Sequence, residues 1–172
     1  MSVENEHRLR FRDAMASLSA AVNIVTTDGL AGRCGITATA VCSVTDTPAT
    51  LMVCINRKSS MNPVFQENGH LCVNILNHEQ ELMARHFAGM TGVSMEERFN
   101  WDIWRTGILG QPLLQGALAN LEGRIEQVQE VGTHYVYLVE IKQIIVREEG
   151  HGLIYFKRGF HPVMDKTLAA AV

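Results

Sequence analysis

Hydroxyl side chains alternate with small apolar ones through residues 36–44, which read ITATAVCSV. Thr37, Thr39, Ser43 and Thr45 occupy alternate positions, interrupted only by Val41. A period of two is typical of a β-strand with two different faces, and hydroxyls both donate and accept hydrogen bonds. The short side chains would also let a flat polar ligand lie close to the backbone. The same pattern fits a solvent-facing strand that uses Thr for its β-propensity, so both interpretations stay open.

A second group of polar residues, NRKSS, spans Asn56–Ser60. It combines two cations with two hydroxyls at the predicted start of a helix, which would run to Gly69 after a cap at Ser59 or Ser60. Helix N-termini bind anions through free N–H groups and the helix dipole, so this segment predicts a phosphate site. A plain helix cap with solvated cations explains the segment equally well.

Two further segments combine side chains that could contact a nucleotide. Gly132-Thr133-His134 puts an imidazole at the start of an apolar strand, where a structural hydrogen bond is the simpler role. The tail LIYFKRGFHP, from Leu153, places aromatic rings beside Lys157 and Arg158. Rings and cations together could cover a flat ring and its phosphates, although an aromatic lid on a barrel would look the same.

Several familiar sites are excluded by spacing. Gly150-His151-Gly152 has Tyr155 where a dinucleotide fingerprint needs its third glycine, and neither a Walker loop nor a G-x-S-x-G elbow occurs. The segment HEQEL has Leu82 where a zinc-protease helix needs its second histidine. A nucleotide would therefore bind without a Rossmann or P-loop cradle, and no metal site is expected.

Composition predicts one ordinary globular domain, residues 1–172. The formal net charge of -3 is spread evenly, which argues against nucleic acid and anionic membranes as partners. Arg8, Arg10 and Arg12 alternate with apolar residues and are interpreted as the solvated side of a helix. The polar N-terminus and the lack of a long apolar run predict a cytoplasmic protein without a membrane span. Reduced, buried thiols are expected at all four cysteines, Cys34, Cys42, Cys54 and Cys72.

Short strands outnumber helices, and the helices interrupt the strands without regular alternation. This order favours a mainly β fold with peripheral helices, a closed or half-closed antiparallel barrel. A capping box, Asn77 with Gln80, predicts a helix that continues through Phe87 and stops at Gly89. The other expected elements are an amphipathic helix over 6–20, strands over 22–27, 36–44, 50–56, 71–76, 117–131, 134–146 and 153–156, and an irregular excursion over 90–111.

Six segments, taken in order, resemble the short-chain flavin reductases, the reductase partners of two-component flavin monooxygenases. They are Thr26-Thr27, GITATAVCSVTDTP, CINRKSS, LCVNILN with LMARHFAG, GTHYVYLVEI and LIYFKRGFH. The resemblance extends over about residues 8–163, and the opening FRDAMASLSAAVNIVTT is most similar to reductases that support 4-hydroxyphenylacetate hydroxylation. One departure is Pro48-Ala49, where the family commonly has two prolines; it removes no polar group. The resemblance implies an antiparallel split β-barrel of the FMN-binding type.

Site residues follow from this resemblance position by position. The strand at 37–45 is expected to line the flavin ring and ribityl chain, the segment at 56–60 to hold the flavin phosphate, and 85–87 to lie near the flavin. The nicotinamide nucleotide is expected at the G-x-H and at the C-terminal aromatic–Arg segment, which border one cleft. The flavin set is Thr37, Ala38, Thr39, Ser43, Val44, Thr45, Asn56, Arg57, Lys58, Ser59, Ser60, Arg85, His86 and Phe87, and the nicotinamide set is Gly132, His134, Tyr155, Phe156 and Arg158.

The function implied is that of an NADH-dependent reductase of free FMN or FAD. Hydride passes directly between the two stacked cofactors, so no catalytic side chain is expected. Reduced flavin then leaves for a separate flavin-dependent oxygenase that hydroxylates an aromatic ring, and a homodimer is expected in which both subunits shape each flavin site. The alternatives are an oxidase of the pyridoxamine-phosphate type, which keeps its flavin, and a non-catalytic flavin-binding protein.

Overall fold

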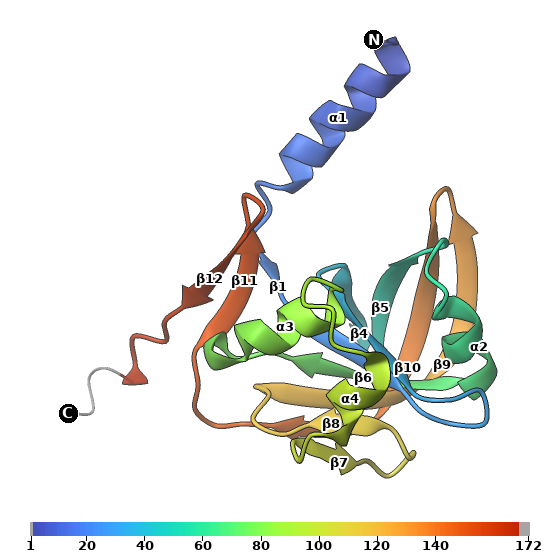
Figure 1. Cartoon of the computed structure of the whole chain (residues 1–172), viewed down its shortest axis with the longest axis vertical. Helices are drawn as coiled ribbons and strands as arrows, with labels where there is room; N and C mark the ends of the chain where they lie inside the picture. Colours follow the sequence, from blue (N-terminus) through green and yellow to red (C-terminus); the bar gives the residue numbers. More distant parts are fainter. Residues whose placement is uncertain (1, 169–172) are drawn as a thin grey trace.

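The computed structural model describes residues 2–168 and shows a mainly antiparallel β-protein with short helices around it (Figure 1). The main sheet has the strand order β3-β2-β6-β9-β10-β5-β4, a smaller sheet has the order β1-β11-β12, and β7 pairs with β8. The helical elements are α1 Val3–Met15, α2 Asn62–Asn68, the 3-10 turn η1 His78–Gln80, α3 Glu81–Phe87 and α4 Met95–Asn100. The strands are β1 Ala20–Ala21, β2 Asn23–Thr27, β3 Cys34–Ala38, β4 Val41–Asp46, β5 Ala49–Asn56, β6 His70–Ile75, β7 Trp104–Thr106, β8 Pro112–Leu114, β9 Ala119–Val131, β10 His134–Val146, β11 Gly152–Phe156 and β12 Gly159–Val163.

The main sheet is curled, and its two edge strands are joined by a short link in the chain. β3 and β4 follow each other in the chain, yet they lie at opposite edges of the sheet order. The link between them is Thr39–Ala40, where the Cys54 N–H donates to the Ala40 carbonyl at 3.0 Å. In the described part of the chain no ladder joins β3 directly to β4. The mainly β, antiparallel fold is therefore confirmed, in a half-closed form.

The expected single strand over 36–44 is wrong in one respect, because the chain breaks at Thr39–Ala40. In β3, Ile36 and Ala38 pack against the core as expected. In β4 the alternation is reversed, because Val41 packs against the core while the Val44 side chain is 55% exposed. A strand that changes partner at a break also changes which of its faces points inward.

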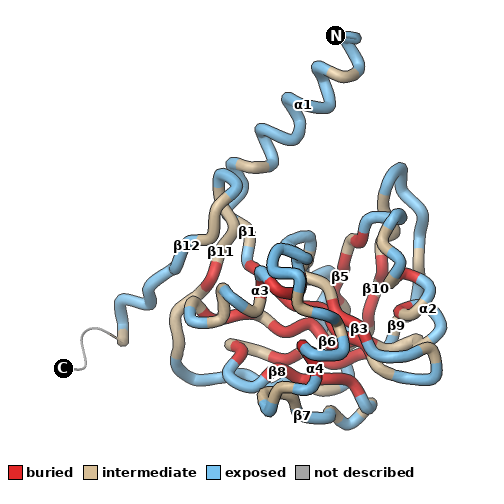
Figure 2. Tube along the Cα trace, in the orientation of Figure 1, coloured by how far each residue is buried: buried red, intermediate tan, exposed pale blue. Residues whose placement is uncertain are grey.

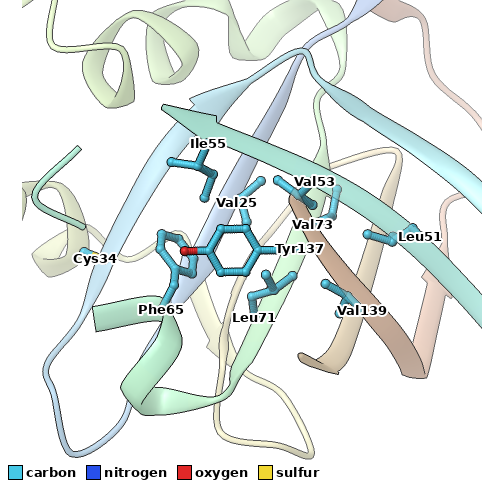
Figure 3. Close-up of a cluster of buried hydrophobic side chains, with 10 residues drawn as sticks. All are labelled: Val25, Cys34, Leu51, Val53, Ile55, Phe65, Leu71, Val73, Tyr137 and Val139. Carbon is cyan, nitrogen blue, oxygen red and sulfur yellow. The ribbon is translucent and has the colours of Figure 1, made fainter. Parts of the chain in front are cut away.

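The main core lies inside the curl of this sheet (Figure 3). Tyr137 of β10 is fully buried at its centre, with the Phe65 ring of α2 at a centroid distance of 6.3 Å. The Tyr137 hydroxyl donates to Asn62 Oδ1 at 2.7 Å and accepts from Gln66 Nε2 at 3.2 Å. Burial of this group raises the pKa of Tyr137. The central hydroxyl of the core is thus bonded to α2, which keeps that helix in place on the sheet.

Three helical predictions need correction or completion. α2 begins at Asn62 after Met61, later than the predicted cap at Ser59 or Ser60, and it ends at Gly69 as predicted, in the left-handed conformation. The capping box of Asn77 and Gln80 is present, but it opens the 3-10 turn η1 before α3. The excursion over 90–111 contains α4 and β7, because Ser94 caps α4 by accepting from the Glu97 N–H. β12 was not predicted.

Helix α1 projects from the body of the molecule and buries none of its residues (Figures 1 and 2). It ends at Met15, five residues before the predicted end, since Ala20 and Ala21 pair with β11. The Lys157 N–H donates to the Ala16 carbonyl at 2.7 Å, which holds the helix end against the β11–β12 turn. None of the helices in residues 2–168 is long and apolar enough to cross a membrane.

Candidate functional site

A cleft of about 850 Å³ lies between α1 and two turns of the main sheet. The first turn follows β5 and the second joins β9 to β10. Five of the predicted site residues, from both the flavin and the nicotinamide sets, meet here although they lie far apart in the sequence. The cleft is lined by Arg8, Phe11, Arg12, Asn56, Arg57, Lys58, Gly132, Thr133, His134 and Tyr135.

Strand pairing brings the two turns together. In the antiparallel β5–β10 ladder, Asn56 lies opposite His134, the last residue of one strand against the first of the other. The pairing continues past the strand end, because the Arg57 N–H donates to the Thr133 carbonyl at 2.9 Å. Gly132 adopts a positive φ of 55°, which a two-residue turn between β9 and β10 requires. The imidazole of His134 lies within 2.9 Å of the Thr133 hydroxyl through Nδ1.

Arg57 is held in place by three contacts on the β9–β10 hairpin. Its Nη1 donates to the Gly132 carbonyl at 3.0 Å and lies 2.8 Å from Glu130 Oε1, and its guanidinium carbon is 5.9 Å from the centre of the Tyr135 ring. Because the pair with Glu130 is solvent-exposed, its effect on stability is small, and its main effect is on orientation. Lys58 has no ion pair within the described residues, so its ammonium group is available to a ligand.

The turn after β5 is closed by asparagine side chains, and α2 has no side-chain cap. Asn62 Nδ2 donates to the Asn56 carbonyl at 2.8 Å and to the Ser59 carbonyl at 3.2 Å. Ser59 Oγ accepts from the Met61 N–H at 3.3 Å, whereas Ser60 is exposed. The predicted helix start at Ser59 or Ser60 is therefore wrong, but the exposed Ser60 hydroxyl and the Lys58 ammonium group remain on the turn before α2.

The hydroxyls predicted to line the flavin lie on β3, on β4 and on the Thr39–Ala40 link between them, a segment called here the β3–β4 edge. Thr37 Oγ1 donates to the Ala84 carbonyl of α3 at 2.7 Å, so that hydroxyl is used to hold the helix against the sheet. Thr39, Ser43 and Thr45 are exposed, and the Thr45 hydroxyl also accepts from the Thr47 N–H at 3.2 Å. Ala38 lies on β3 and is half-buried, and Val44 lies on β4 and is exposed.

The three α3 residues differ in accessibility. Arg85 is exposed, pairs with Glu81 at 3.0 Å, and has its guanidinium carbon 4.9 Å from the centre of the Phe160 ring. His86 is buried, and its Nδ1 lies 2.6 Å from the Thr91 hydroxyl. Phe87 is 2% exposed and belongs to the second core cluster, so its side chain is not available to a ligand in this chain. Of this segment, only Arg85 presents a free side-chain surface.

Tyr155, Phe156 and Arg158 lie on the β11–β12 arm and do not line the cleft of this chain. The expectation that they border the same cleft as His134 is not met within one chain. The β11–β12 turn is bound to the end of α1 by the Arg158–Asp13 ion pair at 2.7 Å, which keeps the arm away from the cleft. In Figure 1 the β11–β12 turn lies at the base of α1, apart from the β9–β10 turn.

Residues 15–164 match the flavin reductase-like domain. The chain belongs to the flavin reductase family. The 4-hydroxyphenylacetate 3-monooxygenase reductase component of Escherichia coli is 74% identical over 166 residues, which cover 96% of this chain and 98% of that protein. The FMN reductase (NADH) RutF of Cronobacter turicensis is 53% identical over 151 residues, which cover 88% of this chain and 90% of that protein. The solved structure of a protein described as a flavin reductase, from Haemophilus somnus, is 42% identical to this chain and superposes with a TM-score of 0.85. The match covers 95% of this chain and 100% of that one.

The side chains of this flavin reductase include groups that can bind a flavin and a nucleotide. Exposed hydroxyls, a free ammonium group and accessible backbone are the donors that a flavin ring, its ribityl chain and its phosphate require. Within residues 2–168 no group of three His, Cys, Asp or Glu side chains is placed to hold a metal ion. The cysteines are free; burial raises the pKa of the Cys34 thiol to about 12 and also raises the pKa of Cys72. Cys42 is exposed, and Cys54 is half-buried, which corrects the expectation that all four are buried.

Sequence reasoning missed half of the cleft of this flavin reductase. From the sequence, Arg8 and Arg12 are expected on the solvated side of an amphipathic helix and Phe11 among its apolar positions, and nothing singles out Tyr135. A signal was present, because these three α1 residues are three and four positions apart and therefore share one helix face. Tyr135 follows directly on the G-x-H segment. What the sequence lacked was any indication that this helix face is turned toward the β9–β10 turn.

Proposed function

We propose that this flavin reductase transfers hydride from NADH to free FMN or FAD and supplies the reduced flavin to a separate oxygenase that hydroxylates 4-hydroxyphenylacetate. The observation that carries the proposal is the 74% identity, across 96% of the chain, to a reductase component of 4-hydroxyphenylacetate 3-monooxygenase. The relative named FMN reductase (NADH) supports NADH as the hydride donor and FMN as an acceptor.

The chain's own residues bind and orient the two cofactors. When both are bound, the cofactors supply the redox chemistry, and hydride passes directly from dihydronicotinamide to flavin. The exposed hydroxyls of Thr39, Ser43 and Thr45 are proposed to hydrogen-bond the flavin ring and ribityl chain, and the turn at 56–60 to hold the flavin phosphate. His134 and Gly132 are proposed to contact the nicotinamide nucleotide. Orientation of two reactants can lower a barrier by about 7–11 kcal/mol, so positioning alone gives these residues a catalytic effect.

A homodimer would complete this site, and we propose that the enzyme is one. In one chain, the β3–β4 edge, the cleft and the β11–β12 arm present their proposed site residues on separate surfaces. α1 and the segment after it also expose large apolar side chains without covering any core, among them Met15 of α1 at 47% and Leu18 at 58% exposure. A second copy packed against α1 and the β3–β4 edge would bury these side chains and bring the separate surfaces together.

The cytoplasm is the proposed location. All four cysteines are free, and Cys42 is exposed, which suits a reducing compartment. The pyridoxamine-phosphate oxidase type and a non-catalytic flavin carrier are the competing functions, and steady-state turnover separates them from a reductase.

Purified enzyme is expected to oxidise NADH only when FMN, FAD or riboflavin is added, with many turnovers per subunit, because the flavin acts as a substrate and leaves after reduction. The measurement is the decrease of NADH absorbance under anaerobic conditions at several flavin-to-enzyme ratios. NADH consumption proportional to added flavin supports the proposal. Flavin-independent oxidation, or one stoichiometric reduction per subunit, contradicts it.

The double substitution Ser59→Ala/Ser60→Ala is expected to weaken FMN binding at least about tenfold and to leave riboflavin binding nearly unchanged. Only FMN has a phosphate, and loss of one charge-assisted hydrogen bond costs about 1.5–3 kcal/mol. Quenching of flavin fluorescence gives both dissociation constants. Equal weakening of the two ligands would show that the serines only stabilise the turn before α2.

His134→Ala is expected to raise the Michaelis constant for NADH severalfold while flavin affinity stays the same, since one ordinary hydrogen bond contributes about 0.5–1.5 kcal/mol. His7→Ala is the matched control, because His7 is exposed on α1 and does not line the cleft. Steady-state kinetics and thermal unfolding are measured on both variants. A lower melting temperature for His134→Ala with unchanged NADH kinetics would make His134 a structural residue of the hairpin.

Sedimentation equilibrium is expected to give about twice the 19.1 kDa mass of the chain. Replacing Leu18, an exposed apolar residue beyond α1, by Glu should shift the protein toward monomer, because a charge in an apolar contact between subunits is unfavourable. A monomeric wild-type protein with full reductase turnover would refute the dimer and leave the reductase proposal intact.

A further inference from the structure

One face of α1 forms a wall of the cleft. Arg8, Phe11 and Arg12 line it together, at spacings of three and four residues, whereas Arg10 does not. In an α-helix each residue advances by about 100°, so Arg10 points away from the face that Arg8 and Arg12 share. The arginines of this helix are therefore not equivalent: two face the cleft and one faces solvent.

The cleft is strongly positive although the whole chain has a formal net charge of -3. Of its ten lining residues, four are cationic, namely Arg8, Arg12, Arg57 and Lys58, and none is Asp or Glu. Arg57 is paired with Glu130 at 2.8 Å, and Arg8 donates to the Asn5 amide at 2.7 Å. Within residues 2–168, the side chains of Arg12 and Lys58 have no hydrogen bond or ion pair. Cations concentrated in a cleft attract a ligand with more than one negative charge.

Two aromatic rings accompany these cations. Phe11 is 62% exposed and belongs to neither core cluster, so packing within the chain does not account for it. Tyr135 is half-buried on the other side of the cleft, beside the guanidinium of Arg57 at 5.9 Å. Exposed rings next to cations stack on flat bases, and cations bind the phosphates that follow the base. A ligand that combines a flat base with phosphates is a nucleotide, so the cleft has the side chains that bind one.

We propose that the α1 face of the cleft binds the adenosine 5′-diphosphate moiety of a dinucleotide. Phe11 stacks on the adenine, and Arg8 and Arg12 pair with the diphosphate from the side opposite Lys58. The cleft of about 850 Å³ lies within the range of about 300–1,000 Å³ that small-molecule sites occupy. FAD and NADH both carry this moiety, and FMN does not. The inference rests on the proposed reductase function, because it names the part of the dinucleotide that this site recognises.

The test uses Arg8→Gln, Arg12→Gln and Phe11→Ala in the full-length protein. None of the three positions is buried, so the variants should fold, which circular dichroism checks. If FAD is the dinucleotide bound here, each variant is expected to lower the affinity for FAD severalfold to tenfold and to leave that for FMN unchanged. If NADH is bound here, the Michaelis constant for NADH rises by the same factor, and that for reduced nicotinamide mononucleotide does not.

Arg10→Gln is the matched control, since it removes the same charge from the other side of the same helix. If Arg10→Gln has the same effect as Arg12→Gln, net charge is responsible and the site is refuted. Unchanged ratios of dinucleotide to mononucleotide in all variants also refute it, as does a shift of Arg12→Gln to monomer without any change in those ratios.

Direct binding separates this inference from the proposed function. Titration calorimetry with ADP should detect binding to the wild-type protein and to Arg10→Gln, and severalfold weaker binding to Arg12→Gln. This measurement needs no turnover, so it supports or refutes the α1 site even if wild-type protein fails to reduce flavin. Conversely, normal flavin reduction with no ADP binding to any variant refutes the α1 site and leaves the reductase function intact.

Discussion

The pairing of β5 with β10 determines where the cleft can form. Backbone hydrogen bonds fix Asn56 opposite His134, so the turn after β5 and the β9–β10 turn lie side by side although about 75 residues separate them in the sequence. A shift of one residue in this register would move every side chain of β10 to the opposite face and expose Tyr137. The register is therefore secured by the core, and the cleft follows from the register.

A single buried asparagine connects that core with the site. Asn62 is 2% exposed; its amide oxygen accepts from the Tyr137 hydroxyl, and its nitrogen donates to the carbonyls of Asn56 and Ser59. Loss of either partner would leave a buried polar group without a hydrogen bond, which typically costs about 1–3 kcal/mol. The hydrogen bonds of Asn62 thus connect the turn that carries Lys58 and Ser60 to the core, while the exposed side of this turn remains free for a ligand.

Much of the sheet could be predicted because its strands carry their signals locally. β6, the long β9–β10 hairpin with its Gly132-Thr133 turn, and the capping box of Asn77 were all predicted close to their observed positions. The wrong predictions concern segments whose conformation or environment depends on residues far away in the sequence. The hydroxyl-rich stretch breaks at Ala40 because its carbonyl accepts from Cys54, and periodicity within 36–44 contains no information about that contact. The α1 arginines looked like a solvated face because only tertiary structure shows that two of them border a cleft.

α1 is the element whose sequence and surroundings agree least. A helix of 13 residues is marginally stable alone in water, and this one buries no side chain. Its contacts with the rest of the chain are concentrated at its end, through the Arg158–Asp13 pair and the Ala16 carbonyl. Further contacts along its length, from a dinucleotide or from a second subunit, therefore add directly to its stability. A ligand or subunit that binds only the helical form of α1 shifts the helix–coil equilibrium of this segment toward the helix. Binding in the cleft and helix formation by α1 are therefore thermodynamically coupled.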